Sequence, residues 1–199
     1  MSEVGELLAD LVVPLGYAVR GGPLATDLWR YKSEHAGRED AAAATRRLGV
    51  MLADFLAHAD AAWAAAGMSA GPSRVAVVPS GQGRPGAHPL ERLAAACFAL
   101  PLVRLATEPR EIHTRGVNPG WVRVGDPVAD ADVVVVDDTW VSGGSAQSVA
   151  AALKLAGARR VAVIVLGRHV NPADPRSAAF LAAAKNSAQA VPWRAAASS

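Results

Sequence analysis

Apolar runs of strand length alternate with amphipathic segments along most of the chain. The strand-like runs are RVAVVPS (74–80), LPLVRLAT (100–107), VVVV (133–136) and RRVAVIVLG (159–167). Residues 38–67 repeat apolar side chains at helical spacing and predict one long amphipathic helix. Further helices are predicted at 89–100, with Pro89 in the first turn, and at 145–156, with Ser145 as N-cap and Gly157 as the stop. This alternation predicts an α/β domain with a mostly parallel central sheet flanked by helices.

Length and composition favour one domain over residues 1–199. The chain has 199 residues, of which 51% are hydrophobic, which suffices for one substantial core. The core is expected over about 38–170, and one short helix is predicted around 177–185 in the Pro- and Ala-rich tail.

Charge and cysteine content exclude several classes of function. Twenty basic and eighteen acidic residues give a net charge of +2, and no Lys/Arg run is present that would follow a nucleic-acid backbone. The single cysteine, Cys97, excludes a disulfide framework and a thiolate metal site, and its apolar surroundings predict core packing. The first residues lack a basic segment before an apolar one, and no apolar stretch reaches about 18 residues, so a cytoplasmic protein without membrane contact is expected.

Candidate chemistry is concentrated in VVVVDDTWVSGGSAQS, residues 133–148, where a buried strand leads into two acids and then into small hydroxyl residues and glycines. In an open parallel sheet, ligands bind at the carboxyl ends of the strands. The loop leads into a predicted helix, whose first N–H groups favour an anion such as phosphate. No lysine follows the glycines, so this is not a nucleotide-triphosphate P-loop.

Two carboxylates beside a bound phosphate would repel it if they pointed at it, so Asp137 and Asp138 should face hydroxyl groups or a cation. A ligand with a phosphate at one end and a vicinal diol beside it satisfies the whole loop. A ribose 5-phosphate has this structure.

These residues resemble the signature of type I phosphoribosyltransferases that binds phosphoribosyl pyrophosphate (PRPP): an apolar strand, an acid pair, a short spacer and a Ser/Thr-Gly phosphate loop. The resemblance extends to the ComF-like branch, because LWRYK at 28–32, VAVVPS and RGVN at 115–118 are similar to segments of that branch. The cysteine zinc finger at the amino terminus of many ComF proteins has no counterpart here. The resemblance implies the type I phosphoribosyltransferase fold, with a small hood from the terminal segments 1–37 and 168–199.

The resemblance also implies an activity: transfer of phosphoribosyl from PRPP with Mg²⁺ to a nitrogen nucleophile such as a nucleobase, with release of pyrophosphate. Catalytic roles are implied for Asp137, Asp138, Arg110 and Arg115, and the two acids would also contact the metal. The implied 5-phosphate site is Val141, Ser142, Gly143, Gly144 and Ser145, and the implied pyrophosphate loop is Ser80, Gly81, Gln82, Gly83 and Arg84. The expected partners are PRPP and an acceptor, without nucleic acid, and the resemblance is compatible with a homodimer.

Several alternatives stay open. Arg110, His113 and Arg115 are either solvent-facing charges or ligands of pyrophosphate on a long connection, and Trp140 is either a core residue or a surface on which a base stacks. Gly81 to Gly86 fits G-x-G-x-x-G, and Glu108 lies where a dinucleotide-binding fold places its ribose-binding acid. A non-catalytic PRPP sensor or a competence-related accessory protein is a further alternative.

Overall fold

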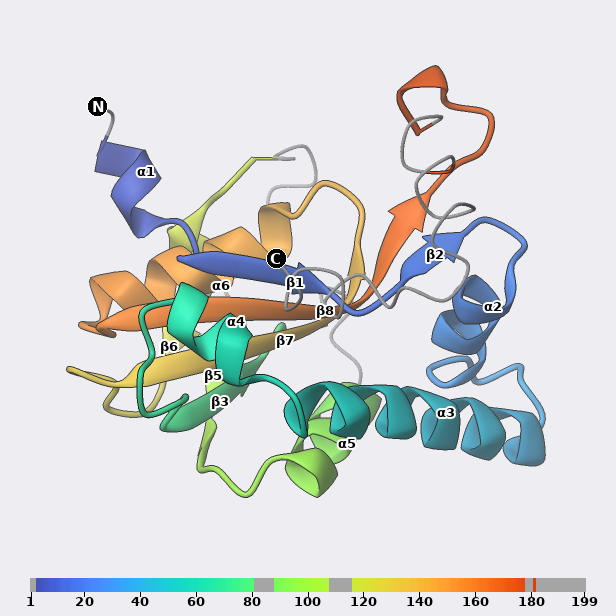
Figure 1. Ribbon diagram of the computed structural model, residues 1–199, viewed down its shortest axis with the longest axis horizontal. Helices are drawn as coiled ribbons and strands as arrows, with labels where there is room; N and C mark the ends of the chain where they lie inside the picture. Colours follow the sequence, from blue (N-terminus) through green and yellow to red (C-terminus); the bar gives the residue numbers. More distant parts are fainter. Residues whose placement is uncertain (1–2, 81–87, 108–115, 178–180, 182–199) are drawn as a thin grey trace. The chain divides into compact units, whose positions relative to one another are not determined.

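A six-stranded sheet runs through the part of the chain that the structure describes, which is residues 3–80, 88–107, 116–177 and 181 of this computed structural model. The strand order is β1-β8-β7-β3-β4, and β2 pairs with β8 beside this path (Figure 1). These strands are β1 (Leu11–Pro14), β2 (Tyr17–Val19), β3 (Arg74–Val77), β4 (Leu102–Val103), β7 (Asp132–Trp140) and β8 (Arg160–Val170). Strand β3 pairs in parallel with β4 and β7, and β2 pairs in parallel with β8. The predicted α/β class with a mostly parallel central sheet is confirmed.

Helices and short elements connect these strands. The helices are α1 (Glu3–Leu7), α2 (Pro23–Arg30), α3 (Arg38–Leu56), α4 (Asp60–Ala65), α5 (Pro89–Cys97) and α6 (Gly144–Leu155), with two 3₁₀ turns, η1 (Pro119–Trp121) and η2 (Pro175–Ser177). Strands β5 (Leu105–Thr107) and β6 (Val122–Val124) form a separate antiparallel pair. Within the described ranges, no helix is long and apolar enough to cross a membrane.

The chain forms two compact units. Unit 1 comprises Met1–Val13, Asp60–Asp137 and Ser142–Ile164, and unit 2 comprises Pro14–Ala59, Asp138–Val141 and Val165–Ser199. In unit 1, Val133 to Val136 of β7 are fully buried, as are Val161 to Ile164 of β8 apart from 1% exposure at Ala162. Such continuous β-branched runs are typical of parallel strands that are covered on both faces.

In unit 2, helix α2 packs closely on strand β8 and on the turn between β1 and β2. A Cβ atom at Gly16 would lie 2.7 Å from the Leu24 side chain, and one at Gly167 would overlap Leu28. Both glycines therefore allow the helix to approach the backbone. The helix begins with Pro23 in its first turn, where the missing N–H of proline costs no helical hydrogen bond.

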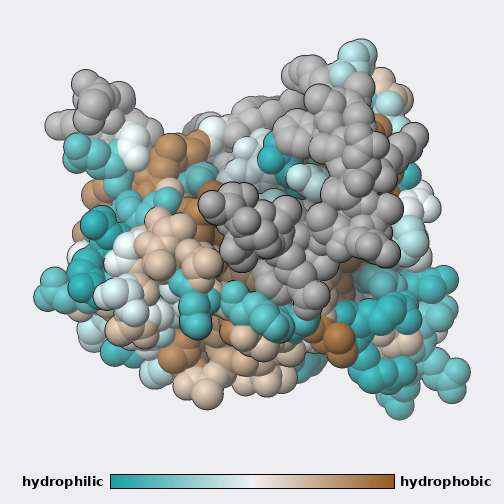
Figure 2. Space-filling model, viewed as in Figure 1, coloured by the Kyte–Doolittle hydropathy of each residue, from teal (hydrophilic) through white to brown (hydrophobic). Residues whose placement is uncertain are grey.

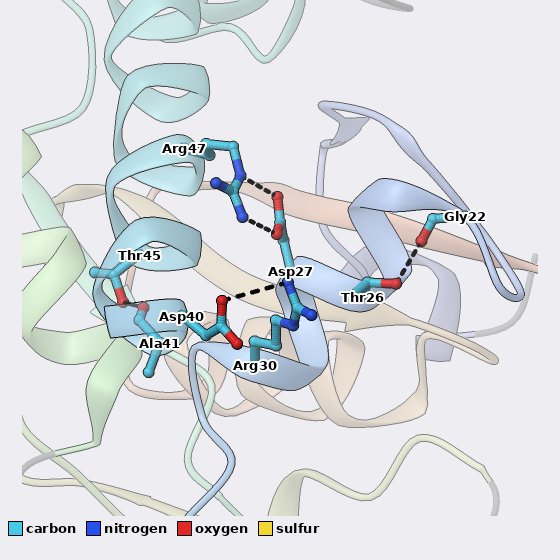
Figure 3. Close-up of polar contacts among 8 residues, drawn as sticks. All are labelled: Gly22, Thr26, Asp27, Arg30, Asp40, Ala41, Thr45 and Arg47. Atoms are coloured by element: carbon cyan, nitrogen blue, oxygen red, sulfur yellow. Dashed lines mark hydrogen bonds and ion pairs between the residues drawn. The ribbon is translucent and has the colours of Figure 1, made fainter. Parts of the chain in front are cut away.

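An ion pair between the buried Asp27 and the exposed Arg47 joins α2 to α3 (Figure 3). The Arg47 guanidinium donates two hydrogen bonds to Asp27, from Nε at 2.8 Å and from Nη2 at 2.5 Å. The Asp27 side chain is 13% exposed, so it depends on this arginine for its hydrogen bonds. The charged first turn of α3, in contrast, is exposed, and Figure 2 shows hydrophilic side chains gathered over this end of the helix.

The prediction of one helix over 38–67 is wrong, because α3 ends at Leu56 and α4 starts at Asp60. The Nδ1 atom of His58 lies 2.8 Å from the Asp54 carbonyl oxygen, an oxygen that a continuing helix would bond to the His58 backbone N–H instead. That N–H donates to the Phe55 carbonyl at 2.9 Å, a tighter i→i−3 turn.

The prediction of one strand over 100–107 is also wrong, because Arg104 separates β4 from β5. The Arg104 backbone N–H donates to the Asp126 carboxylate at 2.6 Å, and its carbonyl accepts from Gly125 at 2.8 Å. These bonds turn the chain from the main sheet to the β5–β6 pair.

Some predictions concern elements at the ends of the chain. Strand β1 lies in segment 1–37, which the resemblance assigned to a hood, and it belongs to the main sheet; the hood stays a prediction. The helix predicted around 177–185 lies mostly outside the described residues.

Helix α5 begins at Pro89 as predicted, but Cys97 at its end is half-buried rather than fully buried, and burial raises the pKa of its thiol.

We expect Arg47→Ala to lower the melting temperature at pH 7 by about 2–4 °C, since it leaves Asp27 buried without its partner. Arg46→Ala, at the exposed neighbouring position, should change it by no more than about 1 °C.

Hydrogen bonds and charge from Arg47 hold the pKa of Asp27 below its ordinary value. The stabilisation is therefore present above about pH 4 and is lost as the pH falls through the folded-state pKa. A difference between wild type and Arg47→Ala that persists undiminished at pH 2 would contradict this assignment.

Candidate functional site

Strand β7 carries the acid pair within its length. The strand runs from Asp132 to Trp140, so the prediction that it ends before the acids is wrong. The β-branched Thr139 and aromatic Trp140 favour extended backbone and account for the continuation. Because consecutive side chains in a strand point to opposite faces, Asp137 and Asp138 lie on different sides of β7.

Asp137 is the last residue of β7 in unit 1, and it is only 9% exposed. It directly follows four valines that are fully buried, so the backbone that carries this carboxylate is held by the packed core. A carboxylate in such a place stays ionised only when hydrogen bonds or a cation compensate for the lost water.

Asp138 lies in unit 2 and is bonded to two residues from the segment after α2. The Tyr31 hydroxyl donates to Oδ2 of Asp138, and the Lys32 ammonium donates to the same oxygen at 2.8 Å. The Asp138 side chain is 14% exposed, and that of Lys32 is 34% exposed. Burial raises the pKa of the Asp138 carboxyl, but the charge of Lys32 and the hydrogen bonds from Lys32, Tyr31 and Thr139 outweigh it, and the pKa lies below its ordinary value.

The loop that the sequence predicts to bind phosphate turns through a left-handed glycine. Gly143 has φ 78° and ψ −2° and is the N-cap of α6, which begins at Gly144. The prediction of Ser145 as N-cap is therefore wrong by two residues: the chain can enter the helix earlier because glycine adopts positive φ without strain. Gly143 has no side chain with which to cap the first turn, and the Gly144 N–H lies a long 3.5 Å from the Ser142 hydroxyl. The start of α6 thus retains the character of an anion site.

A buried serine, not predicted from the sequence, ties this loop to the segment before η1. The Ser148 hydroxyl donates to the Gly144 carbonyl at 2.6 Å and accepts from the Asn118 backbone N–H at 2.9 Å. The Asn118 side chain in turn accepts from the Gly120 N–H at 3.0 Å. A serine one turn into a helix often bonds its own i−4 carbonyl, so no sequence signal pointed to the second contact.

Several predicted site residues lie outside the described part of the chain. These are Gly81, Gln82, Gly83, Arg84, Arg110, His113 and Arg115. Ser80 is described and follows β3, whose end pairs with β7 at Val77 and Val136. Tyr31 and Lys32 belong to the LWRYK segment that carried the resemblance, but the sequence did not predict their contact with Asp138.

The described residues offer no closed metal site, because they contain no group of three or more His, Cys, Asp or Glu side chains that could hold an ion. A single carboxylate such as that of Asp137 is chemically compatible with Mg²⁺ that arrives with a ligand, since Mg²⁺ usually combines one or two carboxylates with water and substrate phosphates.

No family model matches this chain, and no curated protein matches it. Solved structures with similar backbones include a phosphoribosylpyrophosphate synthetase from Mycobacterium smegmatis, at 21% identity and a TM-score of 0.39, over 61% of this chain and 33% of that one. A purine phosphoribosyltransferase from Pyrococcus horikoshii Ot3 matches at 18% identity and a TM-score of 0.40, over 64% of this chain and 87% of that one. A hypoxanthine phosphoribosyltransferase from Staphylococcus aureus matches at 11% identity and a TM-score of 0.42, over 64% and 75%. The match thus spans about a third of the mycobacterial chain.

We expect Gly143→Ala to reduce the free energy of unfolding by about 1–2 kcal/mol, because alanine is strained at positive φ. Gly143→Asn should cost less than half as much, since asparagine tolerates the left-handed region. Gly5→Ala in α1, where an added Cβ meets nothing within 4 Å, is the matched control and should not destabilise the protein. Urea denaturation measures all three, and equal losses for Ala and Asn at Gly143 would show that space rather than backbone conformation limits this position.

Proposed function

We propose that this protein binds PRPP with Mg²⁺ and transfers its phosphoribosyl group to a nitrogen nucleophile such as a nucleobase, as a type I phosphoribosyltransferase of the ComF-like branch. One observation carries the proposal: the acid pair of β7 is followed by a left-handed glycine turn into the uncapped start of α6. An acid pair for a diol and a helix start for a phosphate together match the two ends of a ribose 5-phosphate.

Each part of the loop has a chemical task in this proposal. Residues Val141 to Ser145 bind the 5-phosphate through backbone N–H groups and the hydroxyls of Ser142 and Ser145. Asp137 and Asp138 accept hydrogen bonds from the ribose hydroxyls, and their charge favours the cationic, oxocarbenium-like transition state. Mg²⁺, held by pyrophosphate and the carboxylate of Asp137, would supply charge neutralisation of the leaving group. The side chains that meet the pyrophosphate are proposed from sequence as Ser80 to Arg84, with Arg110 and Arg115 closing over it.

The start of α5 argues against the dinucleotide-binding alternative. That fingerprint requires its third glycine inside the helix, close to the strand. Helix α5 begins at Pro89, and the side chain of its N-cap His88 accepts from the Leu90 N–H at 3.2 Å, so the helix starts after Gly86. The G-x-G-x-x-G match therefore does not place its third glycine inside α5, as a dinucleotide-binding fold requires.

Calorimetric titration tests the proposed ligand. PRPP should bind at least several-fold more tightly with Mg²⁺ than without, because the metal screens the pyrophosphate charge, and NAD should not compete. The Asp137→Asn variant retains the side-chain shape but removes its charge, so it should weaken PRPP binding while the melting temperature stays near that of wild type. Tight NAD binding without any response to PRPP would refute the proposal in favour of the dinucleotide alternative. PRPP binding without pyrophosphate release for any base in a panel would favour the non-catalytic sensor or accessory protein.

A second measurement tests the two arginines of segment 108–115. If they meet pyrophosphate only when this segment closes, they act mainly in the transition state. The double variant Arg110→Ala, Arg115→Ala should leave ribose 5-phosphate affinity within about twofold but lower transfer or PRPP hydrolysis by at least about tenfold, or about 1.4 kcal/mol of barrier. Equal losses of ribose 5-phosphate affinity and turnover would indicate a folding role instead.

A further inference from the structure

The segment that follows Asp138 contains no cation of its own. Residues 139–153 carry no charged side chain, although the proposed ligand brings a phosphate to this loop. Ser142 follows Asp138 by four positions, so their Cα atoms are separated by no more than about 15 Å. At that range a bare carboxylate repels a phosphate dianion appreciably unless a cation lies beside it.

The cation beside Asp138 comes from far away in the sequence. The Lys32 ammonium bonds Oδ2 of Asp138 at 2.8 Å across a sequence separation of 106 residues. Lys32 follows the C-terminal end of α2, where the helix dipole also favours a positive charge. Tyr31, 5% exposed, bonds the same oxygen and fixes it in place.

The segment that carries Lys32 is itself anchored. The Tyr31 backbone N–H donates to the Asp27 carbonyl at 3.0 Å, and the Asp27 carboxylate is held by Arg47 of α3. The backbone next to Lys32 is therefore held by hydrogen bonds, and the Lys32 ammonium has a partner within the protein, the Asp138 carboxylate.

We propose that Lys32 is the built-in counter-ion of Asp138, which lets a phosphorylated ribose bind beside this carboxylate without a divalent cation there. The inference rests on the proposed function and assigns Lys32 as a positioning residue. Mg²⁺ would then be needed for the pyrophosphate of PRPP, and a ligand without pyrophosphate would bind without it.

Calorimetry with ribose 5-phosphate, which has no pyrophosphate, tests the charge beside Asp138 separately from the Mg²⁺ that pyrophosphate needs. Titrations in EDTA and in 10 mM Mg²⁺, at matched ionic strength, compare wild type with Lys32→Met, which keeps the length of the side chain but removes its charge. We expect wild-type affinity to change less than about twofold between the two buffers. Lys32→Met should bind about tenfold more weakly in EDTA and recover most of this loss in Mg²⁺.

A second substitution identifies the charge that causes the loss. Lys32→Met combined with Asp138→Asn has no uncompensated carboxylate, so it should bind ribose 5-phosphate in EDTA within about threefold of wild type. The control Arg30→Met removes a partly exposed cation of α2 that pairs with Asp40, and it should bind as wild type does. An unchanged affinity for Lys32→Met in EDTA would overturn the inference. A loss that neither Mg²⁺ nor Asp138→Asn relieves would also overturn it, because Lys32 would then contact the ligand directly.

A measurement without ligand keeps this inference distinct from the proposed function. If wild type binds neither PRPP nor ribose 5-phosphate, the proposed function fails. The counter-ion is then tested by urea denaturation, in which 10 mM Mg²⁺ should raise the midpoint of Lys32→Met more than that of wild type or of the double variant. An equal response of all three proteins to Mg²⁺ would refute Lys32 as the counter-ion.

Discussion

A carboxylate that is mostly removed from water must be given hydrogen bonds and a counter-charge, and Asp138 imposes this constraint on unit 2. Tyr31 and Lys32 meet it, which fixes the chain just after α2 against the end of β7. The Tyr31 backbone N–H donates to the Asp27 backbone carbonyl, and the Asp27 carboxylate is a second buried charge that needs a partner. Arg47 of α3 satisfies Asp27 in turn. Two carboxylates, Asp138 and Asp27, thus connect β7, α2 and α3 through their hydrogen bonds.

In unit 1, backbone conformation determines how the chain enters α6. In unit 1, the valine run of β7 is fully buried and holds Asp137 at a defined place. After the spacer, Gly143 turns the chain with positive φ, which lets α6 begin immediately and leaves its first turn without a side-chain cap. Ser148 braces this turn by bonding the Gly144 carbonyl and the Asn118 N–H. These bonds hold the backbone N–H groups at the start of α6 in a defined orientation.

The sequence predicted the features that depend on local pattern. Val133 to Val136, the Pro89 helix start and the α/β alternation are all confirmed, because hydrophobic period and proline position determine them directly. The break after Leu56 was missed because a histidine side chain competes for a helical carbonyl in a segment that is otherwise a good helix former. The partners of Asp138 were missed for a different reason. A contact across 106 residues follows from how α2 packs, and no periodicity or spacing in one sequence encodes it.

Asp137 and Asp138 are neighbours in the sequence but do not share the same surroundings. Since side chains alternate along a strand, Asp137 and Asp138 face different surroundings, and a single ion directly bound by both would require the strand to end between them. β7 instead continues to Trp140. Asp138 already has an ammonium on one oxygen, so a divalent cation there would be opposed by the charge of Lys32. The charge of Asp138 is therefore balanced within the protein, by a lysine that lies 106 residues away in the sequence.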